Sequence, residues 1–196
     1  MTERDELEKL YNDFVLKEPK ITEEIEEIVK KSRGFLTGLE NKIKTKESLL
    51  RKIEIETLKE EITEYKALKK IQDILRYTVI LNLENFVEDY YSIVSLLSKK
   101  NYILIKVGNT WKNGNVYKGI NTVLEKDDIK IEIQYHTEES YNLKEKILHK
   151  LYEEYRDTST VKSRKKELQK EMKKISLKIK NPKGIGDING EILFNK

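Results

Sequence analysis

The residues best suited to chemistry start with a regularly spaced set in the first third of the chain. Lys44, Ser48 and Lys52 recur every four residues, and Lys42 precedes them. Residues four apart share one face of a helix, so two ammonium groups and a hydroxyl would point the same way. Such donors suit a polyphosphate, which accepts charge-assisted hydrogen bonds. In a chain this rich in lysine, the same spacing also occurs on an ordinary solvated helix face.

Two charged residues interrupt the apolar run that follows, from Asp73 to Asn82. These are Asp73 itself and Arg76. Burying an unpaired charge is expensive, so we expect both to lie at the mouth of a predicted strand or to be paired. They can serve a phosphate site there, or they can form a structural salt bridge.

A third cluster lies in a turn-rich segment that begins at Asn109 and ends at Asn121. It holds the only tryptophan of the chain, Trp111, together with Tyr117 and Lys118. Aromatic rings, a cation and amides can stack a nucleobase and hold its phosphates. Alternatively, Trp111 anchors the loop in the core.

The fourth cluster alternates with apolar residues near position 133. Glu132, Gln134 and His136 fall on one side of a predicted strand, since successive side chains of a strand point to opposite faces. Three polar groups in register can line a site in which Glu132 acts as a metal ligand or a general base. The alternative is the wet face of an edge strand.

The composition excludes several classes of site and of protein. The 196 residues include 39 Lys/Arg, 35 Asp/Glu, two histidines and no cysteine. Disulfides, thiolate chemistry and multi-histidine metal sites are therefore excluded. No run approaches the length of a membrane span, and the N-terminus lacks the pattern of a signal peptide. We expect a cytoplasmic protein without a membrane partner.

The net charge of +4 comes from one segment near the C-terminus. Residues 161–181 hold nine Lys/Arg and two Asp/Glu, which leaves the rest of the chain slightly acidic. Within them, residues 161–180 are predicted to form a helix with an apolar stripe at Leu168, Met172, Ile175 and Ile179. This basic helix can track the phosphate backbone of a tRNA. Alternatively, the stripe packs on the core or on another subunit and the lysines are merely solvated.

The elements that must position these residues form an α+β pattern. Residues 1–70 are predicted to be helical, with one helix closed by Pro19 and the next capped by Thr22. Beyond them we predict strands at 73–82, 102–107, 116–124 and 129–136, a hairpin turn at 126–128, and helices at 86–99, 139–156 and 161–180. The last residues, 191–195, form a small edge strand or remain loose. The expected fold is a mixed, mostly antiparallel sheet of about five strands flanked by helices, with helical N- and C-terminal extensions.

In this order the clusters resemble the synthetase domain of the RelA/SpoT family of nucleotide pyrophosphokinases. Lys42-x-Lys44-x-x-x-Ser48-x-x-x-Lys52 is similar to that family's Arg-x-Lys-x-x-x-Ser-x-x-x-Lys segment, which contacts the ATP donor. The segment from Asp73 looks like the family's Asp-x-x-Gly-x-Arg strand. The resemblance divides the chain into an N-terminal helical extension (1–40), a synthetase-like domain (41–158) and a basic C-terminal helix and tail (159–196).

The acceptor side of the family pattern is also present. Tyr117-Lys-Gly-Ile-Asn121 resembles a Tyr-Arg-Ser-x-His segment whose Tyr stacks on the acceptor base. Glu132-Ile-Gln134-Tyr-His136-Thr resembles Glu-Ile-Gln-x-Arg-Thr, whose Glu serves the metal and the acceptor. A similar His-Lys pair follows at His149.

Departures from the pattern concentrate at the acceptor and metal positions. On the strand, Arg76 replaces the Gly and Thr78 the Arg, so Arg76 can serve the phosphates from a shifted position. The remaining departures are Asn109 for the metal-binding Asp, Gly119 for Ser, Asn121 for His and His136 for Arg. The donor segment is nearly intact. The sequence thus indicates retained nucleotide binding with an altered acceptor, or lost catalysis.

The resemblance implies an ATP-dependent pyrophosphokinase. Mg²⁺ would be held by Glu132, helped by Asp73, while Lys44, Lys52 and Arg76 neutralise the donor phosphates. The acceptor-binding set would be Asn109, Trp111, Tyr117, Lys118, Asn121, Gln134 and His136. The acceptor would be a nucleotide or the 3′ end of tRNA, and a second copy of the chain or an antitoxin are further expected partners. The alternatives are a toxin or effector domain with different transferase chemistry, and a non-catalytic nucleotide-binding module.

Overall fold

A twisted sheet of five strands forms the centre of the computed structural model, which describes residues 3–111 and 115–189. Its strand order is β1-β2-β5-β4-β3, and only the β2–β5 pair is parallel within this part of the chain. The strands are β1 (Phe35–Thr37), β2 (Leu75–Ile80), β3 (Ile103–Asn109), β4 (Ile120–Lys126) and β5 (Ile129–His136). The predicted α+β class, with a mixed and mostly antiparallel sheet, is confirmed.

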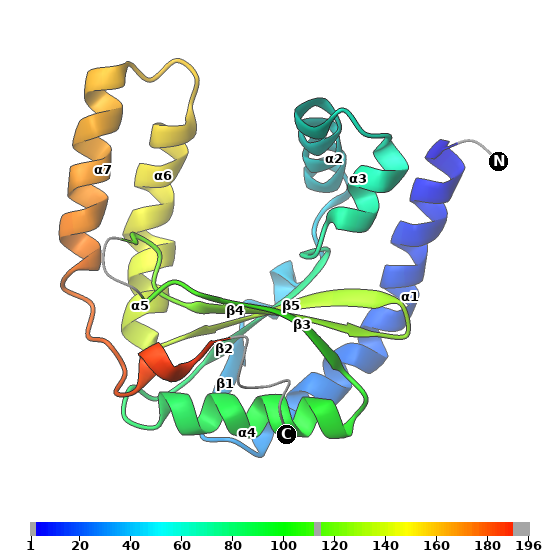
Figure 1. The fold of residues 1–196 in the computed structure, drawn as a ribbon, viewed down its shortest axis with the longest axis horizontal. Helices are drawn as coiled ribbons and strands as arrows, with labels where there is room; N and C mark the ends of the chain where they lie inside the picture. Colours follow the sequence, from blue (N-terminus) through cyan, green and yellow to red (C-terminus); the bar gives the residue numbers. More distant parts are fainter. Residues whose placement is uncertain (1–2, 112–114, 190–196) are drawn as a thin grey trace.

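Helices lie on both faces of this sheet (Figure 1). They are α1 (Glu3–Lys30), α2 (Lys46–Glu60), α3 (Glu64–Lys70), α4 (Phe86–Lys99), α5 (Glu138–Leu143), α6 (His149–Arg156) and α7 (Lys162–Ser176). Short turns of other helix types are η1 (Leu39–Asn41), the π-helical η2 (Lys144–Leu148) and η3 (Ile185–Asp187). No helix in the described ranges is long and apolar enough to cross a membrane.

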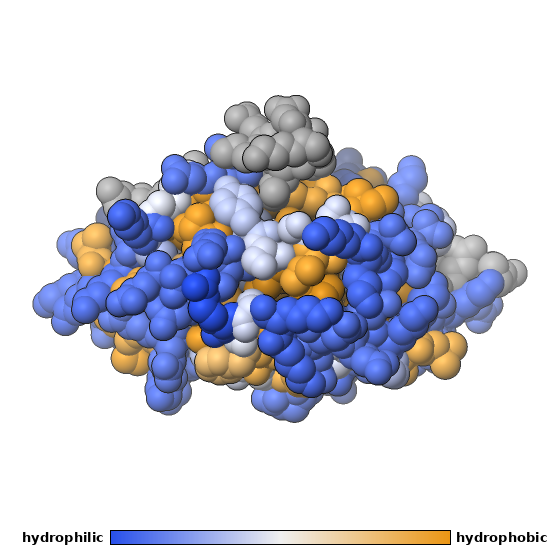
Figure 2. Space-filling view, turned by 90° about the horizontal axis from the view of Figure 1, so that it is seen from below, coloured by the Kyte–Doolittle hydropathy of each residue, from blue (hydrophilic) through white to orange (hydrophobic). Residues whose placement is uncertain are grey.

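The apolar face of the sheet is covered by α1 and α4 (Figure 1). The Tyr90 ring of α4 packs edge-on against the Tyr135 ring of β5, and the Tyr90 hydroxyl lies 3.2 Å from the Thr122 hydroxyl. On α1, the hydroxyl of Thr22 contacts that of Tyr77 on β2 at 2.8 Å. Seen from the α4 side, the molecule is largely hydrophilic, with hydrophobic patches between the charged side chains (Figure 2). Burial against α1 and α4 therefore fixes which face of β2, β4 and β5 is left for polar residues.

The strand β5 follows the predicted bounds and the predicted alternation. Ile131, Ile133 and Tyr135 are buried on the apolar face, and the residues between them lie on the other face. Because β5 lies between β2 and β4, the alternative of a wet edge strand is wrong. The hairpin turn at 126–128 is confirmed, with Asp127 and Asp128 both in the left-handed region that such tight turns need.

The prediction that Pro19 ends the first helix is wrong. Pro19 lies inside α1, and Thr22 is not a cap: its hydroxyl bonds to Glu18, one turn earlier. A proline removes one helical hydrogen bond at a cost of about 3 kcal/mol. Burial of Phe14 on one side of it and of Ile25 on the other offsets that cost, because both side chains enter the same core.

Other boundaries also differ from the sequence prediction. The strand expected at 116–124 begins only at Ile120, and the helix expected at 139–156 is broken by the π-helical turn η2. Strand β1 was not predicted. Gly34 precedes it, and a Cβ there would lie 2.6 Å from Leu81 and 2.8 Å from the Ile80 carbonyl, so only glycine lets β1 approach β2.

The division of the chain into three segments at residues 40 and 158 stays a prediction. One core cluster takes residues from all three predicted segments, among them Ile25, Ile133 and Ile179. The edge strand considered for residues 191–195 lies outside the described residues.

Candidate functional site

A row of polar side chains crosses three neighbouring strands on the face that α1 and α4 leave free. Arg76 of β2 lies beside Glu132 of β5 in the strand register, and Thr78 lies beside Gln134. Gln134 lies in turn beside Asn121 of β4. Strand neighbours in register are about 5 Å apart, so the second and fourth predicted clusters form one surface.

An ion cluster stands at the entrance of β2. The Nζ atom of Lys44 lies 3.1 Å from one carboxylate oxygen of Asp73, and the Nζ atom of Lys52 lies 2.7 Å from the other. Burial raises the pKa of Asp73, but the two lysines outweigh it and hold that pKa below its ordinary value. Asp73 is thus paired at the strand mouth, as the sequence predicted, and it gathers two cations from the segment 42–52.

A cavity of about 260 Å³ opens beside this cluster. Four of its lining residues were predicted for the site: Lys44, Ser48 and Arg76 for ATP binding, and Asp73 for catalysis and the metal. The others are Gly38, Asn41, Ile43, Thr45, Thr78, Tyr141, Lys144 and Glu145. Helix α2 presents Ser48 here because Thr45 caps it: the Thr45 side chain accepts the Ser48 N–H at 3.2 Å.

Lys144 is a cation of this cavity that the sequence reasoning missed. It begins the π-helical turn, and its Nζ atom donates to Gln134 Oε1 at 3.2 Å and pairs with Glu145 at 3.1 Å. Gln134 in turn donates to Glu132 Oε1 at 2.6 Å. Single π-turns within helices often mark functional sites. The only sequence signal was the helical spacing of Tyr141, Lys144 and Glu145.

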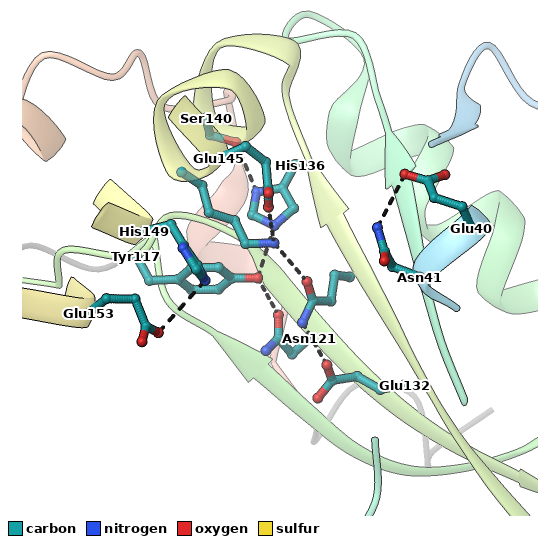
Figure 3. Close-up of polar contacts among 12 residues, drawn as sticks. Glu40, Asn41, Tyr117, Asn121, Glu132, His136, Ser140, Glu145, His149 and Glu153 are labelled. Carbon is teal, nitrogen blue, oxygen red and sulfur yellow. Dashed lines mark hydrogen bonds and ion pairs between the residues drawn. The ribbon is translucent and has the colours of Figure 1, made fainter. Parts of the chain in front are cut away.

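Tyr117 occupies the other end of the polar row. Its hydroxyl donates to Asn121 Oδ1 at 2.7 Å and lies 2.9 Å from His136 Nε2 (Figure 3). Burial lowers the pKa of His136 to about 3, helped by the charge of Lys144, so His136 is neutral near pH 7. Burial also raises the pKa of Tyr117, and the charge of Glu132 adds to that shift. This end of the site therefore consists of uncharged hydrogen-bonding groups.

Several predicted site residues lie away from the cavity and are engaged elsewhere. Lys42 pairs with Glu18 of α1 at 3.2 Å. The side-chain amide of Asn109 donates to the carbonyls of Ile185 and Ile188 at 2.7 and 3.1 Å, which ties the C-terminal segment to β3.

Two further predicted residues, from the loop before β4, are also buried. Trp111 is only 2% exposed and packs edge-on against Phe86 at 5.9 Å, as the core-anchor alternative expects. Lys118 is buried as well, with its Nζ atom 3.1 Å from the Trp111 carbonyl, and burial lowers its pKa. His149, by contrast, is exposed and 3.8 Å from Glu153 (Figure 3).

A larger groove of about 1220 Å³ lies elsewhere, between α1, α3 and the β4–β5 hairpin. Acidic, basic and apolar side chains are mixed along it, among them Asp13, Leu16, Lys69 and Asp128. It contains none of the predicted site residues. We therefore place the site at the smaller cavity, where charged groups converge.

The carboxylates of the site can hold Mg²⁺ in one way only, through a single protein side chain together with the phosphates of a substrate. No cluster of three or more His, Cys, Asp or Glu side chains is present in the described ranges, and both oxygens of Asp73 are held by lysines. Mg²⁺ commonly takes one or two protein carboxylates and completes its shell with water and substrate phosphates. Glu132, on the polar row beside Arg76, fits that mode together with a bound nucleotide.

Comparison with solved structures identifies the fold. A scan against protein-family models and a search of curated proteins give no match. Solved structures do match, and among them are a small alarmone synthetase and a GTP pyrophosphokinase family protein. The resemblance seen in the sequence is thus confirmed at the level of the fold.

Three of these structures illustrate the likeness. Small alarmone synthetase 1 from Bacillus subtilis has a TM-score of 0.57 and 19% identity, over 86% of this chain and 92% of that one. The same protein bound to AMPCPP gives 0.54 and 17%, over 94% and 98%. A GTP pyrophosphokinase family protein from Streptococcus pneumoniae gives 0.51 and 21%, over 88% and 89%.

Proposed function

We propose that this chain is an ATP-dependent pyrophosphokinase that acts on the hydroxyl of a nucleotide or of an RNA 3′ end. The observation that carries the proposal is the convergence of Lys44, Ser48, Asp73 and Arg76 on one cavity. Lys44 and Ser48 match the donor segment of the resembled family, and Asp73 matches the first residue of the strand that follows it. The fold shared with alarmone synthetases supports the same reaction class.

The reaction is a transfer of the β,γ-pyrophosphate. The acceptor oxygen attacks the β-phosphorus, the bond from that phosphorus to the oxygen shared with the α-phosphorus breaks, and AMP leaves with the shared oxygen. The acceptor proton passes to a base, and Glu132 is the carboxylate next to Arg76 on the polar row. When bound, Mg²⁺ would be held by Glu132 and would supply positive charge that offsets the charge of the donor phosphates.

The cations of the cavity would do most of the remaining work. Lys44 and Arg76 line the cavity, and Lys52 lies beside it in its ion pair with Asp73. These cations can stabilise charge that builds up on the phosphates and the leaving AMP. Lys144 adds a fourth cation, from the π-helical turn η2. A cavity of about 260 Å³ is at the low end for nucleotide-sized ligands, so it suits the phosphates while the base lies outside.

The proposal is tested by incubating the protein with labelled ATP, Mg²⁺ and GDP, GTP, ADP or tRNA in turn. AMP release together with a pyrophosphorylated acceptor is expected. The matched control is Glu132→Gln, which keeps the size of the side chain and removes its charge. Binding of AMPCPP without turnover on any acceptor would contradict the proposal and identify a nucleotide-binding module instead.

An RNA acceptor is a specific form of the proposal, and α7 supports it. Its apolar stripe, Leu168 and Met172, is buried, whereas Lys166, Lys170 and Lys173 are exposed. The packing of the apolar side chains on the core, one of the two interpretations of this helix, is thus observed, and contact of the exposed lysines with RNA is part of the proposal. Counterion release makes RNA affinity fall steeply with salt, and neutralising those three lysines should reduce that slope by about two. An unchanged slope would exclude α7 as an RNA contact.

A further inference from the structure

Three of the positions at which the sequence departs from the family pattern surround one phenol. His136 ends β5, Asn121 lies on β4, and Gly119 precedes β4 by one residue. The Tyr117 hydroxyl is 2.9 Å from His136 Nε2 and 2.7 Å from Asn121 Oδ1, and the Tyr117 and His136 rings are perpendicular at 5.2 Å (Figure 3). The departures are therefore neighbours in space.

The hydrogen bonds assign the protons of this group. Asn121 Oδ1 can only accept, so the single proton of the Tyr117 hydroxyl points to it. The phenol oxygen then accepts from His136, which must carry its proton on Nε2. This tautomer leaves Nδ1 as an acceptor 3.1 Å from the Ser140 hydroxyl, whose single proton is shared between Nδ1 and the Thr137 carbonyl, also at 3.1 Å.

The side chains of Tyr117 and His136 occupy space that is free only because residue 119 is a glycine. A Cβ at this position would lie 2.8 Å from His136 Cε1 and 2.9 Å from the Tyr117 hydroxyl oxygen. Both contacts are shorter than real Cβ contacts, and His136 is fully buried, so its ring cannot move aside easily. The glycine and the histidine are thus interdependent.

We infer that Gly119, Asn121 and His136 form one positioning unit that holds the Tyr117 ring in a single orientation for the acceptor. The role of the unit toward an acceptor rests on the proposed function. The packing and the proton arrangement do not, and they can be measured without turnover.

The first test is NMR of the histidine rings, because the chain has only two histidines and the exposed His149 is an internal reference. We expect His136 to show the Nε2–H tautomer and to stay neutral from pH 8 to pH 5. Tyr117→Phe should shift the His136 ring nitrogens and leave those of His149 in place. An Nδ1–H tautomer, or no response to Tyr117→Phe, would overturn the inference.

The second test compares two glycines by thermal unfolding. Gly119→Ala should lower Tm by roughly 3 to 10 °C through overpacking. Gly186→Ala is the matched control, since nothing lies within 4 Å of a Cβ there and neither residue has a positive φ. In a His136→Ala background the loss at position 119 should shrink markedly. Equal losses in both backgrounds would contradict interdependence.

The third test addresses the acceptor. Tyr117→Phe and His136→Ala should raise the KM for the acceptor roughly three- to tenfold and leave AMPCPP affinity unchanged. An unchanged acceptor KM would refute the positioning role even if the NMR and Tm results hold. If the wild type turns over no acceptor at all, the proposed function fails, while the first two tests still decide whether the unit exists.

Discussion

Replacement of His136 should change how the stability of the protein depends on pH. The pKa of His136 is about 3 in the folded state because the ring is fully buried and Lys144 lies nearby, whereas an unfolded histidine titrates near 6.5. The unfolded state therefore takes up the proton first, and stability falls as pH drops from about 6.5 to 3. At pH 4 the loss spans about 2.5 pH units at about 1.36 kcal/mol each, or about 3 kcal/mol.

The assay is urea unfolding at pH 7 and pH 4, followed by the fluorescence of the single, buried Trp111. His136→Gln is the comparison, since it keeps an uncharged polar side chain and cannot titrate. Protonation of carboxylates that are paired in the folded state also lowers the stability of the protein in acid, but this loss is equal in the wild type and in His136→Gln. The wild type should lose about 3 kcal/mol more than His136→Gln. Parallel losses in the two proteins would refute a neutral, buried His136.

Four further substitutions test the charged end of the site. Lys44→Ala and Lys52→Ala should each weaken AMPCPP binding by roughly five- to thirtyfold in calorimetry, because each removes a charge-assisted contact to phosphate; unchanged affinity would place the phosphates elsewhere. Asp73→Asn should lower the free energy of unfolding in urea by about 1 to 2 kcal/mol, because it leaves two partly exposed lysines without their shared carboxylate. An unchanged free energy of unfolding would mean that solvent screens the cluster. Glu132→Gln should lower turnover by at least about a hundredfold while the far-UV spectrum stays unchanged; retained turnover would remove Glu132 from the reaction.

The elements that were predicted well each carry one strong periodic pattern of apolar residues. Strand β5 alternates because one face packs on α4, and α4 itself carries one apolar stripe, so both were predicted with the observed bounds. Pro19 was misjudged because the local cost of a proline is smaller than the burial on either side of it. The start of β4 was misjudged because the backbone of Gly119 exchanges hydrogen bonds with Thr110 before the strand begins.

The candidate site shows the same division between local and distant signals. Lys44 and Ser48 were expected on one face of a helix, but Lys44 lies before α2, which begins at Lys46. The structure nevertheless brings both to one cavity with Arg76. The role of Lys144 was not predictable, because it depends on a π-helical turn and on the hydrogen bond between its Nζ atom and Gln134 of β5. Trp111 and Asn109 have residue types suited to binding, but their hydrogen bonds and burial are set by segments far away in the sequence.

The most direct test of the central claim is product analysis with ATP labelled on the β-phosphorus. The account predicts that AMP accumulates without label and that the label appears, as pyrophosphate, on the acceptor hydroxyl. It predicts further that Glu132→Gln forms neither product. Label that is released as free phosphate or pyrophosphate, or that stays in ATP with every nucleotide and RNA acceptor, would contradict pyrophosphate transfer by this chain.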